Sequence, residues 1–322
     1  MAFSLPDYWV WDFWLADDGD LFHMYYLHAP RSLGDSDLRH RNARIGHATS
    51  RDLMEWVSHG EALGPGAPGN FDETATWTGS VVKGPDGRWR MFYTGSSFSA
   101  PDSNRNIETI GAATSADLYT WSKSPGPILR ADPTWYETLG TSSWPEEAWR
   151  DPWVFRDPGG DGWHMLITAR ANHGDAEGRG VIGHAVSGDL DHWEARPPLS
   201  LPQQGFGHLE VPQLITANGQ SVLLFCCNSP RLANSRQGKM GGIWSAPALG
   251  AKGPFAIELS SLLVDESLYA GRVIQDRSGR LVLLAFDMAE RDGQFLGGVC
   301  DPIPVDLRHG RVDLANRVSG AA

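Results

Sequence analysis

One twelve-residue pattern recurs along the chain, and it constrains the fold more than any other feature of the sequence. The form Ile-Gly-x-Ala-x-Ser-x-Asp-Leu-x-x-Trp occupies residues 45–56, 110–121 and 182–193. Weaker copies lie at 241–255 and 296–307. Repetition over this much chain indicates that one supersecondary unit is stacked several times, so that neighbouring units bury a continuous core together.

Each copy closes a unit of three strand-like runs. The first runs cover residues 9–15, 75–82, 149–155, 208–215 and 268–274. The second runs cover residues 21–27, 88–95, 162–169, 221–227 and 280–286. Most turns between them contain Asp-Gly or Asn-Gly, which favours hairpins. Five such units, each with room for an outer fourth strand, predict an all-β, five-bladed β-propeller with four-stranded antiparallel blades, and we expect residues 1–322 to form this one domain.

The acidic residues inside the repeat are expected to have a structural task. Asp52, Asp117 and Asp189 occupy the same position in every strong copy. An aspartate at such a position stabilises a turn by accepting hydrogen bonds from the backbone. We therefore expect these three residues to shape turns, and the Trp that ends each copy to pack between blades.

Composition excludes several classes of partner. The net charge is −12 and the sequence pI is 5.3, which disfavours nucleic acid and anionic membrane surfaces. Abundant Trp and Gly suit a turn-rich all-β protein with a small neutral carbohydrate as its substrate. Cys226, Cys227 and Cys300 are odd in number, which argues against a disulfide framework. The N-terminus lacks a signal-peptide pattern and no apolar run reaches membrane-spanning length, so we expect a cytoplasmic protein, with its oligomeric state open.

We expect neither a metal nor a cofactor. The acidic clusters at 17–20 and 35–37 lack the ligand spacing of a calcium loop, and solvated turns explain them better. The glycine-rich stretches carry no phosphate-binding lysine and no strand–helix context, so a nucleotide site is not supported.

The first run of each unit should line the central axis of a propeller. These runs differ most in their polar residues, which are Asp12, Ser80, Arg150, Asp151, Glu210, Tyr269 and Arg272. Carboxylates from three blades would thus meet in one hollow. Glycoside cleavage uses such a set, because one carboxyl protonates the leaving oxygen while another attacks the anomeric carbon or activates water. Mutual repulsion and burial separate the pKa values of the carboxyls.

Five ordered motifs resemble glycoside hydrolase families 32 and 68, the invertase, fructanase and levansucrase group. Residues 10–14 resemble Val-Trp-Asp-x-Trp of family 68, residues 77–80 are similar to Trp-Ser-Gly-Ser, and residues 150–152 match Arg-Asp-Pro. Residues 210–212 stand where these families have Glu-Cys-Pro or Glu-Arg-Pro, and residues 268–270 are similar to Phe-Tyr-Ala. The resemblance covers about residues 8–310 and implies a small, divergent member without the C-terminal β-sandwich typical of family 32.

The resemblance implies catalytic roles for three residues. Asp12 would be the nucleophile, Glu210 the general acid/base, and Asp151 the residue that holds fructosyl hydroxyls. The reaction would be a double displacement with retention, which places the two reacting carboxyls ~5–5.5 Å apart.

Further residues are expected to contact the sugar or the catalytic carboxylates. Trp11, Trp14 and Trp77 offer flat apolar faces to sugar rings. Ser80 could donate a hydrogen bond to Asp12, and Arg150 could orient a carboxylate. The remaining candidates for substrate binding are Asp72 and Glu73 on a loop near the mouth of the axis, together with His208, Tyr269 and Arg272.

Several activities remain open at this point. The sequence favours a β-fructofuranosidase that acts on sucrose or short fructans. A fructosyltransferase would share the same first chemical step, and Val211 replaces the residue after the acid/base in both families, so the choice between water and sugar as acceptor stays open. An arabinofuranosidase or a catalytically inactive sugar-binding propeller would also be compatible with these motifs.

Overall fold

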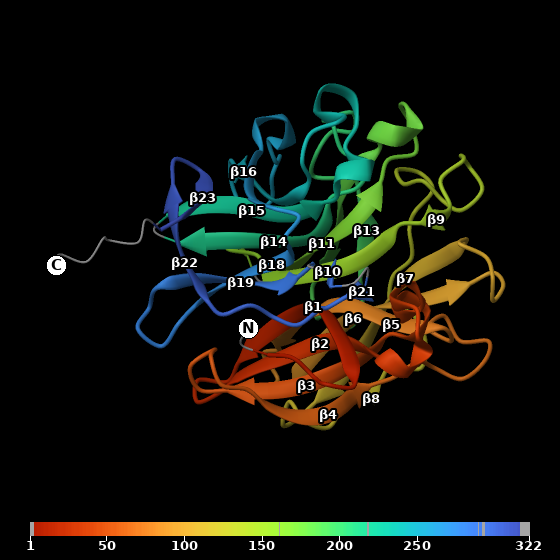
Figure 1. Cartoon of the computed structure of the whole chain (residues 1–322). Coiled ribbons are helices and arrows are strands. Elements are labelled where there is room, and N and C mark those ends of the chain that lie inside the picture. Colours follow the sequence, from red (N-terminus) through yellow and green to blue (C-terminus); the bar gives the residue numbers. More distant parts are fainter. Residues whose placement is uncertain (1–2, 161, 218, 289, 292–293, 316–322) are drawn as a thin grey trace.

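The computed structural model describes residues 3–160, 162–217, 219–288, 290–291 and 294–315, and these build five antiparallel blades around an axis (Figure 1). The first strands of the five blades contact one another in the closed order β1, β5, β10, β14, β18 and back to β1. They are therefore the innermost strands, as the position of the polar residues predicts. No helix in the described part of the chain is long and apolar enough to cross a membrane.

Each blade consists of four consecutive strands, apart from a short hairpin inserted in blade five. Blade one contains β1 (Tyr8–Asp17), β2 (Phe22–Pro30), β3 (Arg44–Ser50) and β4 (Val57–Leu63). Blade two contains β5 (Ala75–Lys83), β6 (Trp89–Phe98), β7 (Asn106–Ser115) and β8 (Ser122–Lys123), and β9 (Glu146–Glu147) pairs with β7 in parallel. Blade three contains β10 (Trp149–Arg156), β11 (Trp163–Arg170), β12 (Gly180–Ser187) and β13 (Glu194–Arg196).

Blade four contains β14 (Glu210–Ala217), β15 (Gln220–Cys227), β16 (Gly242–Ala248) and β17 (Ser261–Asp265). Blade five contains β18 (Leu268–Gln275), β19 (Leu281–Asp287), β22 (Ile303–Arg308) and β23 (Arg311–Leu314), and the hairpin is β20 (Glu290–Arg291) with β21 (Gln294–Phe295). The helical turns are η1 (Arg31–Leu33), η2 (Ser36–Asn42), η3 (Ala176–Gly178), η4 (Ser229–Arg231), η5 (Asn234–Arg236) and η6 (Ile257–Leu259).

The predicted strands are confirmed, with one exception in blade five. The sequence predicts a repeat strand over 296–307, but only the second half of this run joins β22. Gly297 and Gly298 have φ values of +69° and +98°, which interrupt an extended strand. Val299 instead forms bridges with Phe286 and with Phe3, so the start of the chain is joined to blade five and closes the ring.

The repeat residues form the turns expected of them. In the first copy, Asp52 accepts hydrogen bonds from the amides of Met54 and Glu55 at 2.8 and 2.9 Å, and Leu53 adopts a φ of +66°. The same bonds recur at Asp117 and Asp189.

The Trp residues that end the second and third copies pack against the preceding blade, as expected. Trp121 contacts Tyr25 of blade one, and Trp193 contacts Phe92 of blade two, in both cases edge to face. The repeat therefore builds and joins the blades.

Every innermost strand carries a β-bulge at the same level. The register with the second strand shifts between Trp11 and Phe13, between Trp77 and Gly79, and at equivalent places in the other blades, which are Arg150/Trp153, Glu210/Gln213 and Tyr269/Arg272. The bulge residues Asp151, Val211 and Ala270 have φ values of +58°, +52° and +48°. A bulge bends the strand and redirects side chains, so each blade can direct two consecutive residues toward the axis.

Two stacked histidine pairs occupy equivalent positions in blades one and three. His23 and His47 are 3.0 Å apart at their ring nitrogens, and His164 and His184 are 2.9 Å apart. All four rings are buried. Burial, the largest cause, lowers the pKa of His47 to about 3 and that of His184 to about 4.

These pairs predict that acid destabilises the fold. Both His47 and His184 are neutral in the native state, whereas a histidine in the unfolded chain binds a proton below a pH of about 6.5. The free energy of unfolding should therefore fall as pH drops below that value, by up to about 1.4 kcal/mol per pH unit for each histidine. Urea unfolding of His184→Gln between pH 7 and 4.5 should show a shallower pH slope than the wild type, with exposed His173→Gln as control. An unchanged slope in His184→Gln would contradict the assignment.

Candidate active site

A cavity of about 500 Å³ lies where the bulges meet. It is lined by pairs of consecutive residues from the innermost strands, namely Trp11 and Asp12, Trp77 and Thr78, Arg150 and Asp151, Glu210 and Val211, and by Tyr269. These residues coincide with the bulge positions of all five blades. The structure thus brings the three predicted carboxylates into one hollow.

Asp12 is held by a neighbouring blade. Thr78 donates a hydrogen bond to Asp12 Oδ2 at 2.6 Å. Burial, followed by the charges of Asp151 and Glu210, raises the pKa of Asp12 to about 7, although the Thr78 hydrogen bond and the charge of Arg272 oppose the change. The carboxyl of Asp12 therefore changes its charge near neutral pH.

Asp151 is fixed on both its backbone and its side chain. Its amide donates to Thr94 Oγ1 at 2.9 Å, and its Oδ2 accepts from Thr168 Oγ1 at 2.8 Å and from the Val211 amide at 3.1 Å. These bonds hold the residue in its positive-φ conformation, so one carboxylate oxygen is fully engaged. Burial raises the pKa of Asp151, although Arg150 opposes the change.

Glu210 lies among hydrogen-bond donors. Arg150 Nη2 donates to Oε1 at 2.7 Å, the Tyr269 hydroxyl donates to Oε2, and His208 Nε2 lies 3.2 Å from Oε2. Burial raises the pKa of Glu210, but His208, Arg150 and Tyr269 together outweigh burial and lower this pKa to about 2. The structure therefore strongly favours the ionised form of Glu210.

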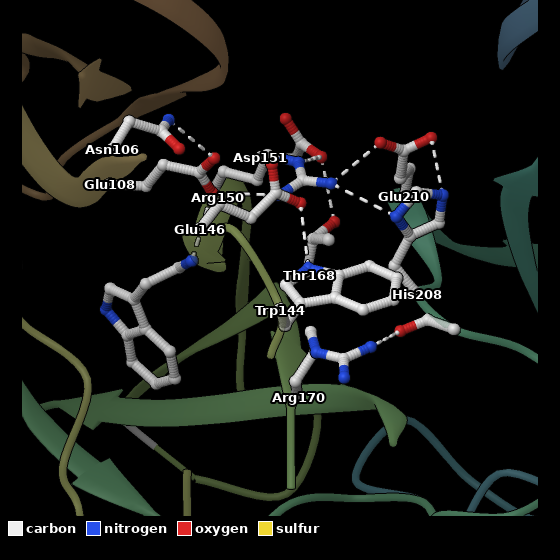
Figure 2. A network of polar contacts seen from close by, with 12 residues as sticks. Asn106, Glu108, Trp144, Glu146, Arg150, Asp151, Thr168, Arg170, His208 and Glu210 are labelled. Atoms are coloured by element: carbon white, nitrogen blue, oxygen red, sulfur yellow. Dashed lines mark hydrogen bonds and ion pairs between the residues drawn. The ribbon is translucent and has the colours of Figure 1, made fainter. Parts of the chain in front are cut away.

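Arg150 is the centre of a buried network of carboxylates (Figure 2). Its Nη1 contacts Glu108 at 2.9 Å and Glu146 at 3.2 Å, and its Nε lies 3.7 Å from Asp151. Together with Glu210, four carboxylates share this one guanidinium. The expectation that Arg150 orients a carboxylate agrees with this geometry.

Part of the cavity lining is aromatic. Trp11 and Trp77 line the cavity, as predicted, and Trp77 Nε1 donates to the backbone oxygen of His40 at 2.8 Å. Arg39 lies over the Trp11 ring at 5.8 Å, and its Nε is buried with no hydrogen-bond partner in the described part of the chain. The two indole rings offer flat faces to a sugar.

Three predicted site residues are not among those that line the cavity. Trp14 is fully buried in the core against Tyr25. Ser80 accepts a hydrogen bond from the Val154 amide, and it is Thr78 that bonds to Asp12. Arg272 donates to the backbone oxygens of neighbouring blades, and only its charge reaches Asp12. All three follow the bulge of their strand, where side chains enter the packed interior.

Asp72 and Glu73 do not line the cavity either. Asp72 is buried and accepts hydrogen bonds from Tyr93 and Lys123. Glu73 accepts from the Gly69 amide at 2.6 Å and from Ser97 at 2.8 Å. Both carboxylates stabilise the loop that leads into β5, and neither is among the residues that line the cavity. His208 and Tyr269, in contrast, do line the cavity.

Sequence reasoning missed several residues of the site. Thr78 was visible inside the 77–80 motif, and its place directly after Trp77 parallels that of Asp12 after Trp11. Glu108 had no such signal, because it lies on the third strand of blade two, and Glu146, in the short strand β9, lies outside every repeat motif. Among the described residues, no group of three His, Cys, Asp or Glu side chains could hold a metal ion.

The bond from Thr78 predicts a measurable effect on Asp12. Its hydrogen bond lowers the pKa of Asp12, so Thr78→Val should raise that pKa. Because the pKa of Asp12 lies above that of Glu210, Asp12 sets the alkaline limb of the pH–activity profile, and this limb should move to higher pH by up to about one unit for a bond of about 1.4 kcal/mol. Thr78→Ser should restore the original limb, and a Thr78→Val profile identical to the wild type would disprove the coupling.

Comparison with known proteins gives a consistent result. The model of the glycosyl hydrolases family 32 N-terminal domain matches residues 14–294. The chain is 26% identical over 324 aligned residues to a sucrose-6-phosphate hydrolase of Zymomonas mobilis, covering 91% of this chain and 58% of that protein. The chain thus spans a little over half the length of that relative.

Solved structures share the fold. An inulosucrase from Halalkalicoccus jeotgali aligns with a TM-score of 0.81 at 23% identity, covering 96% of this chain and 87% of that one. A Bacillus subtilis levansucrase aligns with a TM-score of 0.72 at 14% identity, covering 97% and 87%.

Proposed function

The chain belongs to the glycosyl hydrolases of family 32, and from this premise we propose that it cleaves β-fructofuranosyl linkages, as in sucrose or short fructans, with retention of configuration. The observation that carries the proposal is the meeting of Asp12, Asp151 and Glu210 in one cavity, whose volume of about 500 Å³ suits a small saccharide. The name of the Zymomonas relative, a sucrose-6-phosphate hydrolase, supports the same class of substrate.

In the first step, an ionised Asp12 oxygen attacks the anomeric carbon of the fructosyl unit. The bond to the leaving oxygen breaks, and Glu210 gives its proton to that oxygen. Asp151, fixed by Thr168 and the Val211 amide, has an oxygen left to accept hydrogen bonds from fructosyl hydroxyls. The product of this step is a fructosyl ester of Asp12 and a free leaving sugar.

In the second step, Glu210 accepts a proton from water while the water oxygen attacks the anomeric carbon. The ester bond to Asp12 breaks, Asp12 is released as a carboxylate, and Glu210 is protonated again. Two displacements at one carbon retain the configuration. Trapping the intermediate with methanol should therefore give methyl β-fructofuranoside, and the α product would exclude retention.

The order of pKa values sets a requirement for this mechanism. The first step needs a proton on Glu210 and a charge on Asp12, whereas the surroundings raise the pKa of Asp12 to about 7 and lower that of Glu210 to about 2. The reactive arrangement is thus a minor one at neutral pH. Its population depends on the charges that share Arg150 with Glu210.

A substrate panel tests the proposal. Wild type and Asp12→Ala should be compared on sucrose, raffinose, inulin, levan and nitrophenyl arabinofuranoside. Release of fructose by the wild type alone supports the proposal, whereas cleavage of only the arabinoside would overturn it. With sucrose, equal free glucose and fructose indicate hydrolysis, and an excess of glucose indicates fructosyl transfer.

A further inference from the structure

Glu108 and Glu210 approach the same guanidinium from opposite sides. Arg150 Nη1 contacts Glu108 Oε2 at 2.9 Å, and Arg150 Nη2 contacts Glu210 Oε1 at 2.7 Å (Figure 2). Glu108 is fully buried, while Glu210 is partly exposed at the cavity. Arg150 therefore connects a buried carboxyl to the one that would act on substrate.

The charges around Arg150 do not balance. Glu108, Glu146, Asp151 and Glu210 all contact or approach this guanidinium, and its own charge compensates only one of them. Several negative charges that share one cation are costly where burial limits their contact with water, as it does for Glu108 and Asp151. The cluster therefore retains a proton.

Glu108 can exist in either charge state. Its oxygens accept hydrogen bonds from Asn106, from the Trp149 amide and from Arg150, which favours the ionised form. Burial opposes these donors and raises the pKa of Glu108 to about 8. Burial outweighs the donors, but a pKa of about 8 lies close to neutral pH, so a small change nearby can add or remove the proton.

The state of Glu108 changes how strongly Arg150 stabilises a charge on Glu210. When Glu108 is protonated, the Arg150 cation stabilises the negative charge of Glu210 alone. Glu210 then stays ionised and has no proton to donate. When Glu108 is ionised, it shares the cation, and the proton affinity of Glu210 rises. The two arrangements contain the same number of protons. Only in the second one does Glu210 carry the proton that the leaving oxygen needs.

Other charged groups face this pair, but they do not replace Glu108. Glu146 contacts Arg150 from β9, but Arg150 and His208 overcome the effect of burial and lower the pKa of Glu146, so it stays ionised. Asp151 approaches from β10 with both hydrogen bonds to Oδ2 made by neutral donors. Glu210 additionally faces His208, Tyr269 and the more distant Asp12.

We propose that Glu108 is a positioning residue that controls the protonation of Glu210 through the guanidinium they share. The proposal rests on the acid/base role of Glu210 in the proposed function. Glu108 itself touches no reacting atom. Glu108 weakens the stabilisation of the Glu210 charge by Arg150, so that Glu210 can bind a proton again.

The test is Glu108→Gln, which keeps the shape of the side chain and prevents it from carrying charge. Arg150 then stabilises only the charge of Glu210. Cleavage of sucrose at pH 7 should therefore fall about tenfold or more, and the pH optimum should move about one unit toward acid. Cleavage of 4-nitrophenyl β-fructofuranoside should change little, because its leaving group departs without protonation. Glu108→Asp, which restores the charge, should recover part of the loss.

Glu137→Gln is the matched control. Glu137 is a buried partner of Arg170 and Arg179 that does not line the cavity. Loss of stability in this variant without a shift of the pH optimum shows what a structural ion pair contributes. Equal loss on both substrates in Glu108→Gln, with an unmoved optimum, would reduce Glu108 to such a structural role and overturn the proposal.

A second measurement does not depend on turnover. In a ¹³C-carboxyl NMR titration of the wild type, the Glu210 signal should follow the titration of Glu108, and this step should be absent in Glu108→Gln. A Glu210 signal that ignores Glu108 overturns the coupling even if the enzyme is active. If the wild type cleaves no fructoside, the proposed function fails, while the titration still decides whether the two carboxyls are coupled.

Discussion

Replacing Asp12 by asparagine is expected to abolish fructoside cleavage almost completely. Asparagine keeps the size of the side chain and can still bond to Thr78, but its amide cannot form the ester intermediate. Loss of a covalent nucleophile lowers kcat by on the order of 10⁴-fold or more. The measurement is fructose release from sucrose under saturating conditions. Nitrophenyl fructoside should be equally affected, because both substrates need the same bond to Asp12.

The same residue should control the alkaline side of the pH profile. The reactive form shares one proton between Asp12 and Glu210, and Asp12 has the higher pKa, of about 7, so cleavage should fall as pH rises above neutrality and this proton is lost. Asp12→Asn should also unfold at the same or a higher temperature than the wild type, because it removes one of several crowded negative charges. Activity near wild-type level in Asp12→Asn, or a sharply lowered unfolding temperature, would argue that Asp12 is structural.

Replacing Glu210 by glutamine should give the second-largest effect, with a different dependence on substrate. Glutamine accepts the hydrogen bond from Arg150 but cannot donate an acidic proton to the leaving oxygen. Loss of general acid catalysis costs about 10²- to 10⁴-fold. This loss should appear on sucrose, whose leaving alcohol needs a proton.

The contrast with an activated substrate identifies the role. On nitrophenyl fructoside, the first step should survive in Glu210→Gln and the second should slow, because no base activates water. A burst of nitrophenol followed by slow turnover is therefore expected. Matching losses on both substrates without a burst would be incompatible with an acid/base function for Glu210.

Much of the fold could be predicted because short-range sequence patterns indicate it. Asp-Gly turns, apolar runs and the twelve-residue repeat each report on local structure, and five copies reinforce one another. The failure at 296–307 has the same origin, since the run resembles the repeat while Gly297 and Gly298 prevent an extended strand there.

Only the part of the site that lies on the innermost strands could be predicted from the sequence. Asp12, Asp151 and Glu210 lie beside bulges, and their motifs are contiguous in sequence. Ser80 and Arg272 also lie on innermost strands. No local sequence pattern shows that the bulge in each strand directs their side chains away from the cavity. Glu108 reaches Arg150 only through the way blade two meets blade three, which no sequence spacing reports, whereas Glu146 lies four residues before Arg150.

At the ring of bulges, the side chains that face the cavity are distinct from the backbone pairing that holds the blades together. Each innermost strand supplies one or two adjacent side chains at its bulge, and loops and outer strands supply the rest of the cavity lining. A change of side chain at position 77 leaves the backbone pairing of β5 with β6, and so the strand register, in place. A new sugar preference could therefore arise one blade at a time, through steps that each preserve a folded protein.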